Sequence, residues 1–330
     1  MKKTIIALLS LAIALPVYAE ETITVYSARK EHLIKPLFDA YTDKTGVKIR
    51  YITDKAAPLL ARLKAEGANT PADMLITVDA GNLWQATEKG VLSPVVSDSL
   101  QNNVPAHLRD PDNRWFGLSI RARTIVYSTE RVKPDTLSSY EDLASPAWKG
   151  RLCLRTSKKV YNQSLVAMMI ARHGEEKTSR ILEGWVANLA TTPFSNDTRM
   201  MQAIAAGQCD AGIVNTYYFG RLKKKDPDVA LALFWPNQDE AGVHINISGA
   251  GITQHAKHRD AAIKLLEWLS SEEAQQQFAA LNMEYPVNPR VEPDALVASW
   301  GEFKADELNV ALAGKLQSQA IKLMDRAGYR

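Results

Sequence analysis

The sequence predicts an α/β protein with two lobes, each a mostly parallel sheet flanked by helices, joined by hinge strands around a ligand cleft. Strand-like and helix-like segments alternate through the first part of the chain, which is typical of parallel sheets covered by helices. Near Arg123 loops become frequent, and a strand-like run at 245–251 leads into further helices. We therefore expect two crossings between lobes, near Arg121 and His244. With 330 residues, 46% of them hydrophobic, the chain can form two cores.

The first lobe begins with alternating strands and helices. Short apolar runs predict strands over 22–26, 47–52 and 72–77. Apolar residues at helical spacing predict helices over 31–42 and 59–66. Ligands of such sheets bind at the carboxyl ends of the strands. The loops at 26–30 and 78–79 should therefore border the cleft, together with Arg121, which follows a strand over 116–120.

The rest of the chain supplies the second lobe and the return to the first. The expected strands lie over 124–128, 151–155, 208–214 and 245–251. The expected helices lie over 165–171, 200–206, 260–269, 271–281 and 303–327. We assign 20–121 with 245–300 to the N-terminal lobe, and 122–244 with 301–330 to the C-terminal lobe.

Tyr217 and Tyr218 stand together at the end of a short apolar run. Neighbouring side chains point to opposite faces of a strand and diverge by about 100° on a helix, so two adjacent phenols converge only where the backbone bends. The sequence predicts such a bend, with a strand over 210–214 and a helix opening at Tyr218. Taken alone, the pair is more often a packing feature with solvated hydroxyls than a ligand site.

The first residues have the features of a secretory signal. Lys2 and Lys3 give a positive start, and the apolar stretch 4–16 is too short to span a bilayer. Small residues end at Ala19, where we expect cleavage, so that 1–19 is a signal peptide. The mature protein should be exported and not embedded in a membrane. A membrane anchor is the alternative interpretation, but no stop-transfer run follows.

Charge and motifs argue against nucleic-acid binding and against catalysis. The formal net charge is +3, and two of the positive residues belong to the predicted signal. No basic stripe with interleaved aromatic residues is present, so we expect no nucleic-acid partner. The sequence also has no nucleophile elbow, phosphate loop, dinucleotide fingerprint or zinc-protease helix. We therefore expect a binding protein and not an enzyme.

Cys153 and Cys209 are the only cysteines. In an exported chain a lone pair of cysteines usually forms a disulfide, because the compartment is oxidising. Two cysteines without nearby histidines make a poor zinc site. We therefore predict a disulfide between Cys153 and Cys209.

Several motifs, spread over the mature chain, resemble one family. They are Tyr26-Ser-Ala-Arg29, Thr70-Pro-Ala-Asp73, Gly117-Leu-Ser, Arg121-Ala-Arg123, Pro146-Ala-Trp-Lys-Gly150, Val160-Tyr-Asn-Gln-Ser-Leu165, Asn215-Thr-Tyr-Tyr218, Ser248-Gly-Ala-Gly251 and Glu284-Tyr-Pro286. Together they resemble the periplasmic ferric-iron-binding proteins of bacterial ABC importers. The Trp-Lys-Gly and Tyr-Pro stretches also occur in binding proteins for other solutes. The tandem tyrosine after Asn215, and Tyr161 in its Tyr-Asn-Gln-Ser setting, are more specific and are similar to the subgroup that uses three tyrosines.

The resemblance implies a type II periplasmic-binding-protein fold and a site for Fe³⁺. The implied iron ligands are Tyr161, Tyr217 and Tyr218. Arg121 would bind a synergistic anion, carbonate or bicarbonate, beside the helix start at Thr156 and Ser157. Many relatives have a histidine, often followed by a tyrosine, where this chain has Lys30 and Glu31.

Further ligands are less well defined by the resemblance. An ammonium group cannot coordinate a metal, so Lys30 is expected behind the ligands, together with Asn215 and Asn196. Glu31 is a candidate ligand, and so is Asp79, which stands where some relatives supply a carboxylate. The first lobe would then close over the metal mainly through Arg121, the anion and water.

The chemistry of Fe³⁺ agrees with these residue types. Ferric iron is a hard cation that prefers anionic oxygen, so phenolates suit it better than imidazole or thiolate. A bound cation drives the proton from a phenol whose ordinary pKa is about 10. Three phenolates balance a 3+ charge, which lowers the cost of burying the ion.

We therefore expect a monomeric protein that captures Fe³⁺ and delivers it to an ABC transporter permease. Two alternatives remain at this point. The same fold could bind a small organic solute such as a phosphonate, thiamine or a polyamine, with the tyrosines as stacking walls. A hydrolase or lyase that uses the cleft is the second alternative, and it would need a nucleophile and a base within reach of each other.

Overall fold

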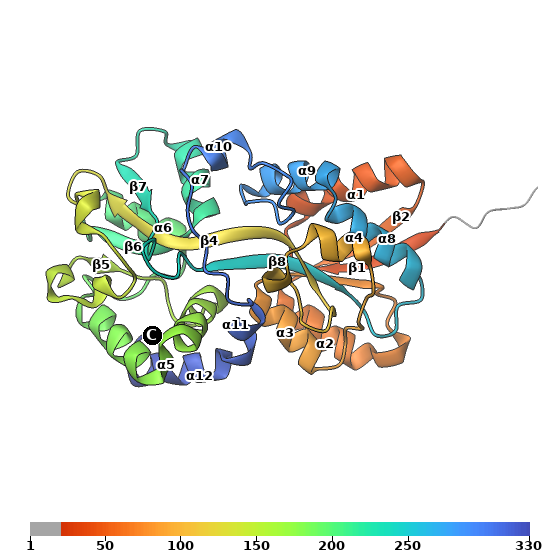
Figure 1. Ribbon diagram of the computed structural model, residues 1–330, viewed down its shortest axis with the longest axis horizontal. Helices are drawn as coiled ribbons and strands as arrows, with labels where there is room; N and C mark the ends of the chain where they lie inside the picture. The colour runs from red at the N-terminus through yellow and green to blue at the C-terminus, as the bar shows by residue number, and fades with distance from the viewer. Residues whose placement is uncertain (1–20) are drawn as a thin grey trace, which may run out of the picture.

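The computed structural model describes residues 21–330, so the predicted signal peptide lies outside the described residues. The described chain forms two lobes, connected by two long strands that pass from one lobe to the other (Figure 1). These hinge strands are β4 (Phe116–Ser128) and β8 (Ile245–Ile252). No helix within 21–330 is long and apolar enough to cross a membrane.

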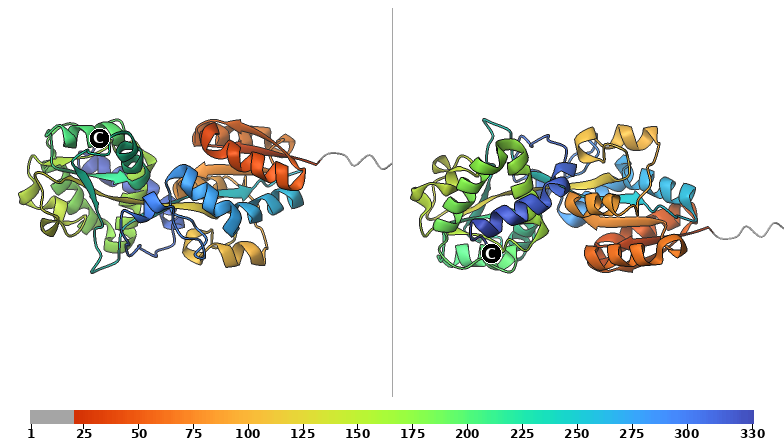
Figure 2. Two further views of the ribbon diagram at one scale, coloured as in Figure 1. Left: turned by 90° about the horizontal axis from the view of Figure 1, so that it is seen from above. Right: turned by 90° about the horizontal axis from the view of Figure 1, so that it is seen from below.

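The N-terminal lobe is a sheet covered by helices on both faces (Figures 1 and 2). Its strands besides the hinge strands are β1 (Thr22–Ser27), β2 (Lys48–Thr53) and β3 (Met74–Val78). Its helices are α1 (Glu31–Thr45), α2 (Ala56–Glu66), α3 (Ala80–Glu88), α4 (Asp98–Asn103), α8 (Arg259–Leu269) and α9 (Glu272–Asn282). The alternation of strands and helices expected from the sequence is confirmed through β3, and these strands pair in parallel.

The C-terminal lobe contains shorter strands and one long helix. The strands are β5 (Leu152–Cys153), β6 (Ala211–Asn215) and β7 (Leu231–Phe234). The helices are α5 (Val160–Ala187), α6 (Asp197–Ala205) and α7 (Thr216–Lys225). Helix α5 is much longer than the predicted 165–171. It has a kink at Gly174 (φ 79°, ψ 169°), where polar residues interrupt the apolar pattern and hide its second half from periodicity.

Strand β4 joins the two sheets. Residues 116–122 pair with β8, and residues 123–127 pair with β6. We predicted two separate strands, over 116–120 and 124–128, which was wrong. The ladder continues through Arg121 and Arg123 because Arg121 lies opposite Asn246 of β8 and Arg123 lies opposite Asn215 of β6.

Strand directions are mixed. Strands β1, β2 and β3 are parallel, as are β5 and β6, whereas every pairing made by β4 is antiparallel and β3 pairs antiparallel with β8. The expected parallel arrangement therefore holds away from the hinge. It fails at the hinge because the chain leaves the first lobe along β4 and returns along β8 in the opposite direction.

The C-terminal segment crosses between the lobes. A single helix was predicted over 303–327, but the chain forms α11 (Ala311–Lys315) and α12 (Gln317–Arg326), preceded by the short α10 (Ala295–Ala298). Helix α11 contacts both α3 and α5, and α12 packs along α5 (Figure 2). Gly314 allows this contact, because a Cβ there would lie 2.3 Å from Cβ of Trp84. Our division of the chain into lobes at particular residues stays a prediction.

The predicted disulfide is confirmed. Cys153 in β5 and Cys209, just before β6, are bonded, with a Cα–Cα distance of 5.9 Å, and both are buried. They lie within a core cluster of the C-terminal lobe that includes Val126, Met200 and Ile204.

Replacing both cysteines by alanine should destabilise the C-terminal lobe. The bridge closes a loop with a sequence separation of 56 residues. Its removal should lower the free energy of unfolding by about 2–4 kcal/mol, because the unfolded chain gains conformational freedom. Urea unfolding of the Cys153→Ala/Cys209→Ala variant, compared with oxidised wild type, measures the difference. Equal unfolding midpoints and slopes would show that the bridge does not stabilise the fold.

Candidate metal centre

The corner predicted at the tyrosine pair is present. Strand β6 ends at Asn215 and helix α7 begins at Thr216, which places Tyr217 and Tyr218 in the first turn of the helix. The two rings are tilted by 41°, with their centroids 4.5 Å apart. Tyr217 is buried and Tyr218 is half-buried. The bend therefore brings two adjacent phenols to one side of the chain, which a continuing strand could not do.

Tyr161 joins this pair from the first turn of α5. The Arg155 guanidinium faces the rings of both Tyr161 and Tyr218, and the three phenols influence one another's ionisation. Burial raises the pKa of Tyr161, and the neighbouring Tyr218 raises it further, while Arg121 opposes the shift. Burial also raises the pKa of Tyr217 well above its ordinary value. The structure thus gathers the three predicted phenols, and Tyr161 and Tyr217 are protonated at neutral pH.

A buried polar network orients Tyr217. The Nδ2 group of Asn215 donates to the Tyr217 hydroxyl oxygen at 3.0 Å, and Oδ1 of Asn215 accepts from Arg123 at 3.1 Å. The Arg123 guanidinium also donates to Oδ1 of Asn162, at 2.9 Å from Nε and 2.6 Å from Nη2. Sequence reasoning placed Asn215 behind the ligands but missed Arg123 and Asn162. Arg123 thereby links Asn162, the neighbour of Tyr161 in the chain, to Asn215, which holds Tyr217.

Three arginine side chains surround the phenols. The guanidinium carbon of Arg121 lies 5.6 Å from the centroid of the Tyr161 ring. That of Arg155 lies 5.3 Å from the same ring and 5.8 Å from the Tyr218 ring. That of Arg221 lies 5.0 Å from the Tyr217 ring. Positive charge at this range favours the phenolate form.

Sequence reasoning did not identify Arg155 and Arg221 as site residues. Arg221 is four residues after Tyr217, so helical spacing places it on the same face of α7. Its position could therefore have been found by assuming the helix. Arg155 reaches the site only through the fold: it is buried beside α6 and forms an ion pair with Asp197 at 2.7 Å. No local pattern brings Arg155 to the tyrosines.

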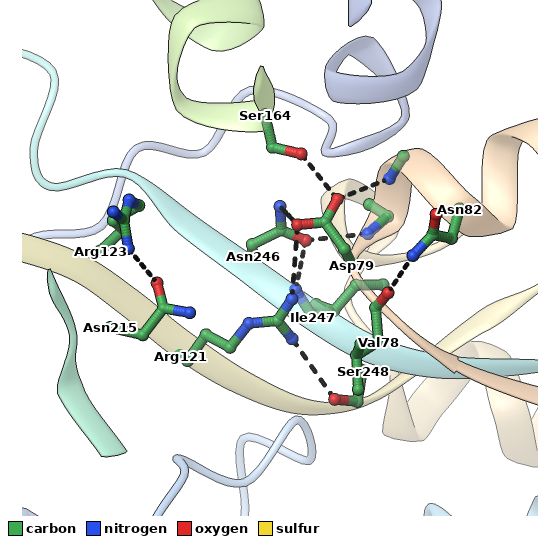
Figure 3. Close-up of polar contacts among 12 residues, drawn as sticks. Val78, Asp79, Asn82, Arg121, Arg123, Ser164, Asn215, Asn246, Ile247 and Ser248 are labelled. Carbon is green, nitrogen blue, oxygen red and sulfur yellow. Dashed lines mark hydrogen bonds and ion pairs between the residues drawn. The ribbon is translucent and has the colours of Figure 1, made fainter. Parts of the chain in front are cut away.

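Arg121 carries an unused hydrogen-bond donor into the site. Its side chain is 2% exposed, and Nη1 donates to Oγ of Ser248 at 3.3 Å (Figure 3). Nη2 lies 3.6 Å from a carboxylate oxygen of Asp79 and has no hydrogen-bond partner. A buried donor without a partner is costly. An oxyanion bound against this nitrogen would remove the cost.

Asp79 is fully buried, and its carboxylate is surrounded by donors. Oδ1 accepts from the Gly81 amide at 3.0 Å and from the Ser164 hydroxyl at 2.6 Å. Oδ2 accepts from Nδ2 of Asn246 at 3.1 Å and faces Arg121 (Figure 3). Burial raises the pKa of Asp79, while Arg121 and the hydrogen bonds oppose that shift. None of the groups that contact the Asp79 carboxylate belongs to a tyrosine.

Glu31 and Lys30 lie on the exposed start of α1. The Tyr51 hydroxyl donates to Oε1 of Glu31 at 2.9 Å, and Lys30 is the residue that precedes the helix. Asn196 is half-buried, and its side chain caps α6 by accepting from the Arg199 amide at 2.9 Å. The structure gives none of the three a contact with Tyr161, Tyr217 or Tyr218.

Thr156 and Ser157 precede α5, which begins only at Val160. Their amide groups already donate to the Phe194 carbonyl at 2.9 Å and to the Arg330 carbonyl at 3.3 Å. These two amides are therefore not the free donors of a helix start, and the two hydroxyl groups are the donors that remain for an anion.

Within residues 21–330, no three histidine, cysteine or acidic side chains gather to hold a metal. The oxygen-rich cluster in the described residues consists of the phenol groups of Tyr161, Tyr217 and Tyr218. Such a donor set suits a hard trivalent cation better than zinc or a soft metal.

Comparison with known proteins defines the class. Residues 69–301 match the family of bacterial extracellular solute-binding proteins. The chain is 44% identical to iron uptake protein A1 of Synechocystis sp., with 94% of this chain and 88% of the relative covered. It is 26% identical to the major ferric iron-binding protein of Neisseria meningitidis, with 98% of each covered. The chain therefore belongs to the bacterial extracellular solute-binding proteins, which are not enzymes.

Similar solved structures narrow the family to which the chain belongs. A Trichodesmium protein, IdiA or FutA, solved with iron and citrate, is 45% identical, with a TM-score of 0.91 and coverage of 94% of this chain and 100% of the other. Ferric iron-binding protein A of Mannheimia haemolytica, in an open conformation, is 39% identical, with a TM-score of 0.89 and coverage of 94% and 99%. Within its class, the chain is a member of the periplasmic ferric-binding protein family, and the predicted two-lobed fold is confirmed.

Proposed function

We propose that this protein binds Fe³⁺ in the periplasm, through the phenolates of Tyr161, Tyr217 and Tyr218, and delivers it to an ABC transporter permease. The observation that supports the proposal is the meeting of three phenols from α5 and α7. The Tyr217 and Tyr218 ring centroids are 4.5 Å apart, and the Arg155 guanidinium carbon lies 5.3 Å from the Tyr161 ring and 5.8 Å from the Tyr218 ring. Relatives at 44% and 45% identity are an iron uptake protein and a protein solved with iron, which supports the same cargo.

The chemistry follows from charge. Three phenolates carry as much negative charge as Fe³⁺ carries positive charge, so the loaded site is close to neutral before the arginines and the anion are counted. The arginines at 5.0–5.9 Å from the rings lower the cost of ionising the phenols. Asn215 fixes the direction of the Tyr217 oxygen, as partners behind metal ligands generally do.

We propose that the synergistic anion is carbonate or bicarbonate bound to Arg121. The unpaired Nη2 group of Arg121 supports an oxyanion there, and the hydroxyl groups of Thr156 and Ser157 are further donors near α5. The Trichodesmium relative was solved with citrate, so citrate is the natural competitor in the experiment. We keep Asp79 and Glu31 outside the proposed ligand set because both oxygens of Asp79 and Oε1 of Glu31 already accept hydrogen bonds.

The remaining parts of the proposal concern location and assembly. The residues 1–19 would be removed as a signal peptide, and the mature chain would act as a monomer. The lobes, 20–121 with 245–300 and 122–244 with 301–330, would close around the ion by bending at β4 and β8.

Titration of the pure protein with ferric citrate tests the function. Phenolate-to-iron charge transfer should give an orange-red colour that saturates at one ion per chain. A phosphonate, thiamine and a polyamine, added in separate thermal-shift measurements, test the alternative of an organic solute. A colourless protein that is stabilised by one of these solutes would overturn the iron proposal.

Replacing Lys30 or Glu31 by alanine should leave the colour and the iron affinity unchanged within about twofold. Both residues lie on the exposed start of α1, and the Glu31 carboxylate is bonded to Tyr51. Competition with citrate measures the affinity. A large loss in the Glu31→Ala variant would instead identify Glu31 as a ligand.

A further inference from the structure

The backbone at Asp79 is held in an unusual conformation. Asp79 precedes α3 with φ 79° and ψ 125°, a positive φ that residues other than glycine rarely adopt. Its amide donates to the Ile247 carbonyl of β8 at 2.8 Å. The next amide, that of Ala80, donates to Oδ1 of Asn246 at 2.9 Å. Strain of this kind persists only where surrounding contacts fix it, and it commonly marks a functional position.

The carboxylate of Asp79 connects the two lobes. Asp79 lies at the start of α3 in the N-terminal lobe, and Ser164, which donates to it at 2.6 Å, lies on α5 in the C-terminal lobe (Figures 1 and 3). Both side chains are fully buried. Ser164 is three residues after Tyr161, so both lie on one face of α5. The contact with Asp79 therefore fixes the helical turn that carries one of the three phenols.

The same carboxylate faces both hinge strands. It accepts from Asn246 of β8 and lies 3.6 Å from Nη2 of Arg121 in β4. Asn246 and Arg121 are also paired across the two strands. One side chain thus reaches α5, β4 and β8, which together carry Tyr161, Arg121 and the bend between the lobes (Figure 3).

We propose that Asp79 is a positioning residue for the iron site, and not a metal ligand. Its carboxylate holds the Arg121 guanidinium and the first turn of α5 in place, so that the anion donor and Tyr161 are aligned before iron arrives. The inference rests on the proposed function for its effect on iron, but the alignment itself exists in the iron-free protein.

Two variants separate the two contacts. Ser164→Ala removes only the hydroxyl group that joins the lobes. Asp79→Asn keeps an oxygen for Ser164 but turns an amide donor toward Asn246 and Arg121, which are donors themselves. Asn82→Ala is the matched control, because Asn82 lies in the same turn of α3 and bonds to the Val78 carbonyl at 2.7 Å, without touching the carboxylate.

In the iron-free protein, amide hydrogen exchange over 160–165 should accelerate at least about tenfold in both Ser164→Ala and Asp79→Asn, and not in Asn82→Ala. In the iron titration, both variants should lose about 10–100-fold in affinity, the effect typical of groups that orient ligands. The charge-transfer maximum should stay at the wild-type wavelength. Asp79→Asn should also need more bicarbonate to load iron, because Arg121 is displaced.

Unchanged exchange over 160–165 in Ser164→Ala would overturn the positioning role, even if iron binding is confirmed. A shifted absorption maximum in Asp79→Asn, with a normal Ser164→Ala, would identify Asp79 as a ligand and also overturn it. A colourless wild type would contradict the proposed function alone, and the exchange measurement would still decide the inference. If Asp79→Asn does not fold, Ser164→Ala carries the test.

Discussion

Tyr217→Phe is expected to abolish tight binding of ferric iron. Tyr217 is the most buried of the three phenols, its hydroxyl oxygen accepts a hydrogen bond from Asn215, and phenylalanine fills the same space without the oxygen. Losing groups behind a metal ligand costs about 10–100-fold in affinity, so losing the ligand itself should cost more than about 100-fold. One negative charge would also be missing from a site that arginines already make positive. Competition with citrate, followed at the charge-transfer band, measures the loss.

The other two phenols should behave in the same way, and one tyrosine elsewhere should not. Tyr161→Phe and Tyr218→Phe are expected to lose the colour or most of the affinity. Tyr51→Phe makes the same chemical change in the N-terminal lobe, where the hydroxyl donates to the Glu31 carboxylate, and this variant should bind iron normally. Thermal unfolding should show that each variant folds. A Tyr217→Phe protein that retains colour and affinity would contradict the proposed ligand set.

Acid is expected to weaken iron binding steeply. Burial raises the pKa of Tyr161 and Tyr217 in the iron-free protein, so both phenols carry protons throughout the neutral range. Iron must displace these protons, and each displaced proton makes the affinity fall by up to about tenfold for every pH unit lost. Because the pKa values are raised, the affinity should keep increasing with pH up to those raised values. Competition with a chelator of known pH dependence measures the slope.

Proton release can be counted directly. Calorimetric titration in two buffers with different ionisation enthalpies gives the number of protons released for each ion bound. Tyr161→Phe should release one proton fewer than wild type where it still binds iron. An affinity that rises as the pH falls, or no proton release at all, would exclude binding through phenolates.

Much of the fold could be predicted from the sequence, because short-range patterns of apolar residues specify many of its helices and strands. The apolar periodicity of α1, α2, α8 and α9, and the apolar runs of β1, β2 and β8, predicted these elements to within a few residues. The convergence of Tyr217 and Tyr218 followed from the bend between a strand and a helix. The disulfide followed from two cysteines in an exported chain.

Elements near the hinge were harder to predict, because their continuity depends on partners that are distant in the chain. Strand β4 reads as two strands, yet β8 and β6 sustain it through Arg121 and Arg123. Helix α5 reads as a short helix until its packing on α12 is known.

The sequence by itself determined the class of protein, the two-lobed fold and the disulfide, and it singled out three tyrosines as candidate ligands, because motifs and backbone periodicity are local properties of a chain. Only the tertiary structure decided which groups surround those phenols. Arg155 comes from the loop after β5 and Asn215 is oriented by Arg123, while Asp79 faces Ser164 across the lobes. Such contacts join residues that are far apart in the chain, and burial gives them their strength, so neither residue type nor spacing could reveal them.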